Sequence, residues 1–588
     1  MSQNEANMVM VKQQMVRRIV SPFAAIRRLA SSTCSRWILV GSLLCLNQSQ
    51  AIAQQQPRLT HRWELEPDLG ASWVYVAPKP AIELEPSRFS AAERQFRLME
   101  SQKAIRNAGD PKLTGRESSL QTILTQLKTI DEDEVVQRSL VTAAIKLADE
   151  SYASELWERL HNDNSSRMLI EPALVRWKSP VALDVWRARL SDLDVSNAEL
   201  IVAIEGIGTV GGEQDLAALE SLLRSDRTSP PMKIVVARAM GSLATRNLEG
   251  LAEQVNATRV DQHSLIVAEL LARHSSERAR QLIAEVLKSD NPAARCVAYQ
   301  AIARNDVTWA HELAPEMLSQ SENQLRQQSV EVLSRFEDAD SLRTQSMALG
   351  DRNLAICNLV RESLTKKAQI AELKPIVDEA IAFHLQSDSP RAVVQAILLS
   401  VALNERERCP LFVKLLDHSV VDTSMTAAWA LQALVDSPEL LDLIFQHTEP
   451  ITQRLQKGEE VLRHEIYQQA YLFEALGRNG YRPALDSLKL YIPKDGQRMG
   501  DVSRASAIWA IGKINADSHD AELAKQLAGR MLDQSTEIPE SPLVQFASAV
   551  ALGWIKAPAS IGELQRVTDA LPAPIALARD WSLSRFKE

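Results

Sequence analysis

Apolar and polar positions along most of the chain recur with the period of an α-helix. In one repeated pattern a polar or basic residue is followed by small or apolar residues at three, six and seven positions, and often by glycine at eight. These spacings place the side chains on one helical face, and small side chains allow a neighbouring helix to approach closely. The clearest copies span residues 233–241, 295–302, 469–477, 504–512 and 545–553.

The copies occur in tandem. Their centres are Ala173, Gly206, Ala239, Leu270, Ala301, Val332, Asn358, Ile397, Ala433, Ala475, Ala510 and Ala551. Successive gaps are 33, 33, 31, 31 and 31 residues as far as Val332, and they vary from 26 to 42 afterwards. A turn and a second amphipathic segment follow each copy, as in residues 216–226, 280–290, 410–419 and 483–492. Because one helix pair cannot bury its apolar face alone, tandem pairs stack into a continuous core. The pattern therefore predicts an all-α fold, an α-solenoid of stacked antiparallel helix pairs over residues 135–575.

The repeat resembles the HEAT-repeat family, particularly the short bacterial HEAT-like repeats of the phycobilin-lyase type. Residues 287–303, LKSDNPAARCVAYQAIA, are similar to the family consensus of a leucine, an aspartate, an Asn-Pro pair, an arginine and spaced alanines. Residues 471–488 and 505–517 are also similar. The copies centred on Asn358 and Ile397 lack the glycine and are irregularly spaced, which indicates either non-repeat helices or bends of the superhelix. Such a solenoid presents extended concave and convex surfaces that suit a macromolecular partner.

The first 53 residues are interpreted as a signal segment of an exported protein. Six basic residues and one acid precede residue 37, an apolar run covers residues 37–46, and Ala51-Ile52-Ala53 follows as a cleavage site. Ten apolar residues are too few to cross a bilayer, so we expect cleavage near Ala53 and a periplasmic or secreted protein without an integral membrane segment. Two alternatives are an uncleaved signal anchor that tethers the protein to the membrane and a lipoprotein at Cys45.

The remaining segments differ from the repeat. Residues 54–89 contain five prolines and read as an extended arm, either a mobile tail or a strap that docks Trp63, Trp73 and Tyr75 on the solenoid. Residues 90–134 are expected to form N-terminal capping helices, beginning at a capping box at Ser90. Residues 576–588 are predicted to be a C-terminal tail.

Charge and cysteine content narrow the function further. The net charge of −9 becomes −9 − 5 = −14 once residues 1–53 are removed, which disfavours a nucleic-acid partner. Cys296, Cys357 and Cys409 then remain, without a CxxC motif, and we expect them to be buried thiols rather than disulfide partners.

Three motifs suggest chemistry, and each has a structural explanation. Residues 206–211 (GIGTVG) match a dinucleotide-binding GxGxxG, but they lie in register with the repeats, and no parallel sheet is predicted around them. His311-Glu312 and His464-Glu465 could suggest metal ligands; because Gln468 stands where a zinc protease needs histidine, we interpret both pairs as solvated polar residues. The acidic run at residues 131–134 suits a helix N-terminus and lacks calcium-loop spacing.

The positions of the tryptophans do not identify the binding face. Most lie in helical segments, where they are expected in the core or on a binding face: Trp157, Trp177, Trp186, Trp309, Trp429, Trp509, Trp554 and Trp581.

The sequence thus predicts an exported, non-enzymatic scaffold that binds a protein partner through the solenoid surface. No catalytic, cofactor-binding or metal-binding residue is assigned, and the partner-binding residues are undetermined. Through its resemblance to the phycobilin-lyase and hydroxylase subsets, the alternative is an accessory lyase or hydroxylase that acts on a bound cofactor or metal. A third possibility is a polysaccharide-binding module, which would require a line of exposed aromatic residues.

Overall fold

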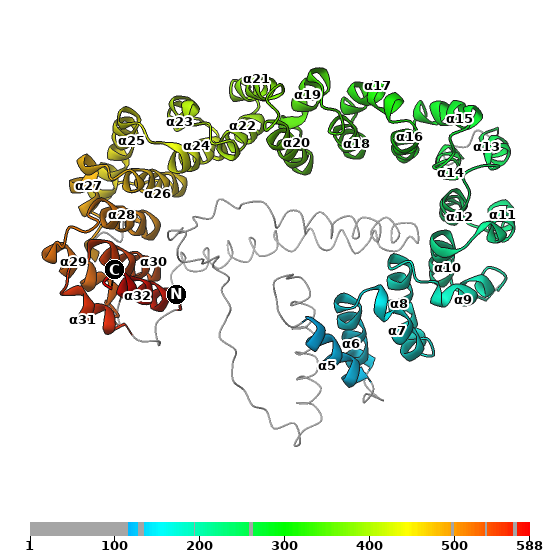
Figure 1. Ribbon diagram of the computed structural model, residues 1–588, viewed down its shortest axis with the longest axis horizontal. Coiled ribbons are helices and arrows are strands. Elements are labelled where there is room, and N and C mark those ends of the chain that lie inside the picture. Colours follow the sequence, from blue (N-terminus) through cyan, green and yellow to red (C-terminus); the bar gives the residue numbers. More distant parts are fainter. Residues whose placement is uncertain are drawn as a thin grey trace, which may run out of the picture. The chain divides into compact units, whose positions relative to one another are not determined.

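The computed structural model describes residues 116–127, 134–192, 194–257, 263–494, 499–535, 538–567 and 573–587. Within these ranges every regular element is a helix, and no strand occurs (Figure 1). The helices form two compact units that divide inside α21 (Lys374–Leu385): the N-terminal unit ends at Ala380, and the C-terminal unit begins at Ile381. No described helix is both long and apolar enough to cross a membrane.

The N-terminal unit has two layers of helices. The even-numbered helices line its concave side and are called inner helices, and the odd-numbered helices form the outer layer (Figure 1). The inner helices are α6 (Glu134–Leu147), α8 (Asn164–Arg176), α10 (Asn197–Val210), α12 (Pro230–Leu243), α14 (His263–Leu270), α16 (Pro292–Asn305), α18 (Asn323–Leu333) and α20 (Leu354–Lys367). The outer helices are α5 (Arg116–Leu127), α7 (Ala153–Leu160), α9 (Leu183–Arg189), α11 (Leu216–Arg224), α13 (Glu249–Asn256), α15 (Glu277–Leu287), α17 (Val307–Leu318) and α19 (Ala339–Ser346).

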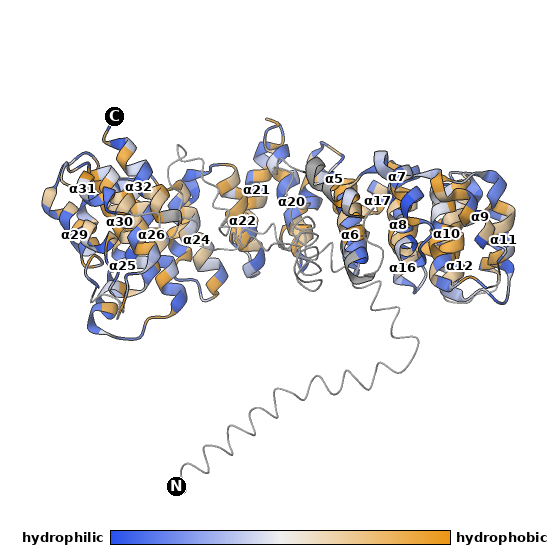
Figure 2. Ribbon diagram, turned by 90° about the horizontal axis from the view of Figure 1, so that it is seen from below, coloured by the Kyte–Doolittle hydropathy of each residue, from blue (hydrophilic) through white to orange (hydrophobic). Residues whose placement is uncertain are grey.

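The C-terminal unit repeats this two-layer arrangement. Its inner helices are α22 (Pro390–Ala402), α24 (Val421–Leu434), α26 (Arg463–Arg478), α28 (Asp501–Ile514), α30 (Pro542–Ile555) and α32 (Ala573–Arg585). Its outer helices are α23 (Cys409–Leu415), α25 (Pro438–Lys457), α27 (Leu485–Lys489), α29 (Ala521–Met531) and α31 (Ser560–Gln565). Hydrophobic and hydrophilic residues alternate along the helices of both units, as expected for helices with one buried face (Figure 2).

The predicted α-solenoid of tandem helix pairs, the architecture that the HEAT resemblance implies, is confirmed. All twelve centres of the sequence pattern fall in successive inner helices, from Ala173 in α8 to Ala551 in α30. The glycine of the pattern marks close approach between neighbouring inner helices. A Cβ added to Gly241 in α12 would lie 2.0 Å from the carbonyl oxygen of Glu269 in α14. The irregular copies at Asn358 and Ile397 lie in α20 and α22, on either side of the division between the units.

Several predicted boundaries fall at the ends of the described chain. The signal segment (1–53) and the arm (54–89) lie outside the described residues, and of the capping region (90–134) only α5 and the first residue of α6 lie within them. The predicted tail (576–588) instead lies mostly in α32, a further inner helix. Its Ile575 and Trp581 are buried, and the Ser582 hydroxyl donates a hydrogen bond to the Ala549 carbonyl oxygen at 2.7 Å.

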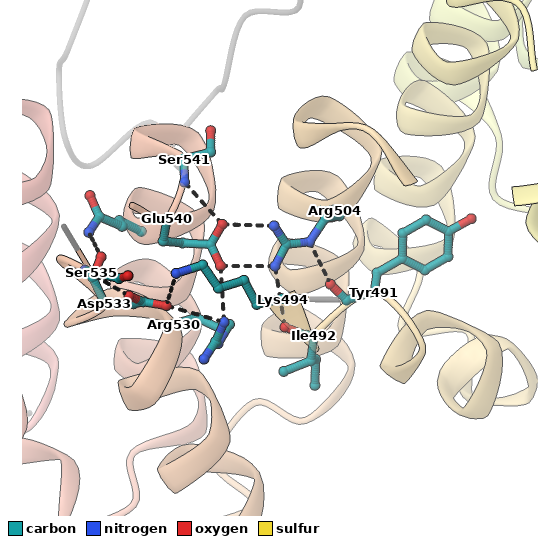
Figure 3. A network of polar contacts seen from close by, with 10 residues as sticks. Tyr491, Ile492, Lys494, Arg504, Arg530, Asp533, Ser535, Glu540 and Ser541 are labelled. Carbon is teal, nitrogen blue, oxygen red and sulfur yellow. Dashed lines mark hydrogen bonds and ion pairs between the residues drawn. The ribbon is translucent and has the colours of Figure 1, made fainter. Parts of the chain in front are cut away.

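At several copies the polar residue that begins the pattern ties one repeat to the next. Arg326 of α18 donates to the Asp351 carboxylate, just before α20, at 2.7 Å and to the Gln320 carbonyl oxygen at 2.9 Å. Arg504 of α28 forms the equivalent network in the C-terminal unit (Figure 3). Its guanidinium donates to both carboxylate oxygens of Glu540, at 2.7 and 2.9 Å, and to the Tyr491 carbonyl oxygen at 3.2 Å. Arg326 and Arg504 therefore each bond to both a backbone carbonyl and an acid in the segments around them.

The three described cysteines are buried, as predicted, and no disulfide joins them. Burial raises the pKa of the Cys409 thiol to about 11 and also raises that of Cys296. Because the thiolate is the reactive form, we expect iodoacetamide at neutral pH to leave Cys296, Cys357 and Cys409 unmodified in the folded chain and to alkylate all three in urea. Mass spectrometry of the alkylated chain checks this, and rapid labelling without urea would contradict it.

His274 makes the N-terminal unit sensitive to acid. Its side chain is 3% exposed, and burial lowers its pKa below the ordinary 6.5, against the opposing charge of Glu249. In the unfolded chain this histidine binds a proton near pH 6.5, whereas in the folded chain it binds one only at lower pH. The free energy of unfolding therefore falls as the pH drops below about 6.5, and the histidine does not affect it at higher pH. We expect urea midpoints to decrease between about pH 7.5 and about pH 5.5, and to decrease less in His274→Gln. Equal slopes for the two proteins would contradict this assignment.

Candidate partner-binding face

The last four inner helices of the C-terminal unit pack closely enough to form one continuous inner face. An added Cβ would lie 2.6 Å from the Ala510 Cα at Gly477, 2.6 Å from the Ala551 Cα at Gly512, and 2.5 Å from the Ser582 hydroxyl at Gly553. Glycine at these positions lets α26, α28, α30 and α32 approach one another. Their inward side chains can therefore contact one another across helices.

Helical register places aromatic and basic side chains on this face. In α28, Ala510 faces α26, Gly512 faces α30, and Arg504 reaches the outer turns. The fourth side of the helix, which faces inward, carries Trp509 and Lys513, four residues apart. The same register applies to Trp554 in α30 and to Trp581 and Arg585 in α32.

These side chains form an alternating series across the four helices, here called the cation–aromatic ladder: Arg478, Trp509, Lys513, Trp554, Arg585 and Trp581. The Arg478 guanidinium carbon lies 5.8 Å from the centre of the Trp509 ring, and the Lys513 Nζ lies 5.9 Å from the same ring. The Lys513 Nζ also lies 3.9 Å from the Trp554 ring centre, and the Arg585 guanidinium carbon lies 5.0 Å from it. Indole faces attract cations electrostatically, so each ring holds the neighbouring charge in place.

Trp554 is the member of the ladder with an unmet hydrogen bond. Its side chain is 6% exposed, and among the described residues its indole N–H has no acceptor. Its ring contacts Trp581 edge to face, with ring centres 5.3 Å apart. A buried donor left unpaired costs about 1–3 kcal/mol, so this position favours an added acceptor.

An acid lies on the same face one turn before Arg478. Glu474 is buried and accepts hydrogen bonds from the Gln432 amide and, at 3.4 Å, from the Ser506 hydroxyl. Burial, followed by the charge of Glu474, raises the pKa of the adjacent Tyr471 to about 12, so this phenol stays neutral. The inner face therefore combines a buried acid and a neutral phenol on α26 with the cations and indoles of the ladder.

The inner helices of the N-terminal unit use their charges differently. Arg238 of α12 pairs with Glu269 of α14 at 2.6 Å. Arginines near the ends of successive inner helices donate to carbonyl oxygens of the preceding repeat: Arg273 to Ser242, Arg304 to Ala272, and Arg335 to Ala303, at 2.8, 3.1 and 3.2 Å. These cations neutralise the negative ends of helix dipoles within the unit, whereas the ladder cations cover aromatic rings.

The GxGxxG motif is part of a repeat, as predicted. Gly206 and Gly208 lie within α10, where an added Cβ would lie 2.4 Å from the Trp186 ring and 2.7 Å from the Ala239 Cα, respectively. Gly211 only ends the helix. The glycines therefore permit helix packing.

The two His-Glu pairs belong to different units. His311 lies in α17 of the N-terminal unit, where its Nε2 is 2.6 Å from the Ser341 hydroxyl and its ring contacts Phe336. His464 and Glu465 lie in the C-terminal unit, where Glu465 caps the start of α26 and pairs with Arg454 at 2.7 Å. The interpretation as solvated residues was too simple, because His311 and Glu465 are partly buried and bonded. Within the described ranges no three histidine, cysteine or acidic side chains cluster as metal ligands.

The eight described tryptophans lie in the core or under other side chains. All eight helical tryptophans are buried or half-buried, and Phe383 is the only aromatic among the exposed large hydrophobic residues described. The described chain therefore lacks the line of exposed aromatics that a polysaccharide-binding module requires. The acidic run at residues 131–134 lies outside the described residues except for Glu134, the first residue of α6.

The chain matches no protein-family model and no curated protein. Among solved structures it is similar to importin beta, with 11% identity over 84% of this chain and 72% of that one (TM-score 0.41). It is also similar to yeast importin-beta (Kap95p), with 14% identity over 84% and 68% of the two chains (TM-score 0.39). A further similar structure is Kap121p bound to RanGTP, with 11% identity over 84% of this chain and 57% of that one (TM-score 0.44). Similarity at this level assigns neither function nor partner to this chain.

Proposed function

We propose that this protein is an exported, non-enzymatic scaffold that binds a protein partner on the inner face of the C-terminal unit. The observation that carries the proposal is the cation–aromatic ladder, which continues across α26, α28, α30 and α32. Tryptophan and arginine are the residues most enriched at binding hot spots. A continuous face built from successive repeats suits an extended segment of a macromolecule.

Export is the second part of the proposal, and the signal-like residues 1–53 support it. We expect N-terminal sequencing of the protein recovered from cells to begin directly after Ala53. A first residue within 1–53 would contradict cleavage at this site. Membership of the phycobilin-lyase type of HEAT-like proteins stays a prediction.

Site-specific photo-crosslinking in intact cells tests the binding face. Leu577 of α32 lies one turn before Trp581 on the inner face and is 52% exposed. A photoreactive phenylalanine at Leu577 should capture a protein partner. At Leu443 of the outer helix α25, which is 45% exposed, the same substitution should capture none. Trp554→Ala should weaken capture at Leu577. Equal capture at both positions, or capture unaffected by Trp554→Ala, would contradict the proposed face.

A further inference from the structure

We propose that the N-terminal unit carries a second binding surface, which recognises an extended acidic peptide with a carboxylate at every third residue. The surface consists of Arg273, Arg304 and Arg335 and is here called the arginine strip. This inference goes beyond the proposed function, because the strip lies in a different unit from the cation–aromatic ladder and the chemistry of its ligand is specified.

The three arginines recur once per repeat, at intervals of 31 residues. Arg273 lies just after α14, Arg304 lies in the last turn of α16, and Arg335 lies just after α18. The middle helix, α16, packs against both of the others (Figure 1). The strip therefore places one guanidinium at the same end of each of three successive inner helices.

Each guanidinium is held in place and keeps one edge for a ligand. All three residues are exposed, and the Nη1 atom of each donates to a carbonyl oxygen of the preceding repeat, at 2.8, 3.1 and 3.2 Å in chain order. Among the described residues these guanidiniums form no ion pair. The edge formed by Nε and Nη2 can therefore donate two parallel hydrogen bonds to a carboxylate. Because the carbonyl bond already orients the side chain, less conformational freedom is lost on binding.

Acids close to the strip in sequence do not neutralise it by direct contact. Glu337, two residues after Arg335, is exposed and forms no ion pair with it. The other acids within one helical turn have partners elsewhere: Glu269 pairs with Arg238 at 2.6 Å, Asp306 pairs with Arg280 at 2.9 Å, and Glu331 accepts from the Gln327 amide at 2.9 Å. An added carboxylate would therefore meet cations that have no competing acid in contact with them.

The spacing of the arginines selects the conformation of the ligand. Packed helices lie ~8–10 Å apart, so neighbouring members of the strip are separated by about this distance. A polyproline II peptide has three residues per turn and rises ~3.1 Å per residue, so every third side chain points the same way at intervals of about 9 Å. An acid at every third residue would therefore place one carboxylate opposite each arginine. Clusters of arginine are a known means of recognising acidic motifs.

The charges around the strip favour a peptide over a continuous polyanion. Glu269 and Glu331 lie one turn before Arg273 and Arg335 on the same helices. A nucleic acid or a polyphosphate carries a charge on every unit and would bring further negative groups close to these carboxylates. Like charges placed side by side disfavour a partner, whereas a peptide with spaced acids limits its charges to the positions opposite the arginines.

Fluorescence anisotropy with the purified chain tests the inference. The probe is a labelled peptide of repeated Glu-Pro-Pro, in which proline favours the polyproline II conformation. We expect it to bind, and to bind more weakly as salt is added. A peptide of the same composition with all its glutamates contiguous should bind more weakly, and repeated Gln-Pro-Pro should not bind.

Variants of the middle arginine test the contact itself. Arg304→Gln should weaken binding of the Glu-Pro-Pro peptide about two- to fivefold, as expected for one exposed ion pair. Arg227→Gln is the matched control, because Arg227 is exposed in the turn between α11 and α12 and forms no ion pair. Arg304→Glu should prefer a peptide whose central glutamate is replaced by lysine. This exchange of preference cannot result from a folding defect.

Chemical modification of the native chain gives a readout that needs no variant. Phenylglyoxal modifies accessible arginines, and mass spectrometry locates them. The Glu-Pro-Pro peptide should protect Arg273, Arg304 and Arg335 and leave Arg227 reactive.

Several results would overturn the inference. They are equal binding of the contiguous peptide, unchanged binding in Arg304→Gln, no exchange of preference in Arg304→Glu, equal protection of Arg227, or tighter binding of inorganic polyphosphate than of the peptide. Trp554→Ala should bind the peptide as the native chain does. The arginine strip and the partner-binding face can therefore fail separately.

Discussion

Replacing Arg504 with alanine is expected to destabilise the C-terminal unit by about 3–5 kcal/mol, since it removes one partner of a fully buried ion pair. The Arg504 side chain is fully buried, and that of Glu540 is 1% exposed. Burial alone would raise the pKa of Glu540, but the hydrogen bonds and charge of Arg504, with the Ser541 N–H and Arg530, hold that pKa below its ordinary value. The variant would leave this carboxylate charged in the interior with weaker compensation (Figure 3).

Hydrogen exchange by mass spectrometry is the appropriate measurement, because repeat arrays can unfold in parts. Peptides from α28 and α30 should lose protection in Arg504→Ala, while peptides from the N-terminal unit should not. Arg566→Ala removes a largely exposed pair with Glu563 and should change stability by less than about 0.5 kcal/mol. The double variant Arg504→Met, Glu540→Leu should recover part of the loss. Unchanged exchange in Arg504→Ala would show that the network adds no stability.

Gly241→Ala is the second change with a large expected effect. The added methyl would lie 2.0 Å from the Glu269 carbonyl oxygen and 2.9 Å from that of Leu270, so α12 and α14 must move apart. Because backbone rather than a flexible side chain is in the way, we expect a loss of about 1–3 kcal/mol, the usual cost of overpacking.

Gly250→Ala is the matched control. Gly250 lies in α13 with nothing within 4 Å of an added Cβ, so alanine should be neutral or stabilise by up to about 1 kcal/mol. Urea unfolding followed by circular dichroism should therefore move the two midpoints in opposite directions. A Gly241→Ala midpoint equal to that of the native chain would mean that the helices do not approach as closely as described.

The repeat was predictable from sequence because its signal is local. Ala510 and Gly512 point to neighbouring inner helices, and their spacing along one helix is visible in the sequence alone. Ala510 lies against Gly477 of α26, and Gly512 lies against Ala551 of α30, which explains why small residues recur in the pattern. The end of the solenoid was predicted too early, at residue 575, because α32 lacks the repeated pattern. Trp581 and Ser582 of this helix are nevertheless buried, and Ser582 bonds to Ala549 of the preceding inner helix.

The candidate face was less accessible to sequence reasoning. Trp509 and Lys513 are four residues apart, as are Trp581 and Arg585, and this spacing was a usable signal for one helical face. The contact of Lys513 with Trp554, however, joins residues from different repeats. It depends on how far each helix is rotated and shifted against the next, which composition and spacing do not fix. For the same reason the ion pair of Arg504 could not be predicted, because its partner Glu540 lies in a loop outside the repeated pattern.

The arginine-to-carbonyl bonds of the N-terminal unit all run from one repeat to the repeat before it. Arg273, Arg304 and Arg335 each complete the helix end of the repeat before them, at intervals of 31 residues. A stretch of that length therefore carries both a donor for its predecessor and an acceptor for its successor. Tandem duplication of such a stretch would extend the protein with every new helix end already satisfied, whereas losing the last copy would strip the donor from the one before it.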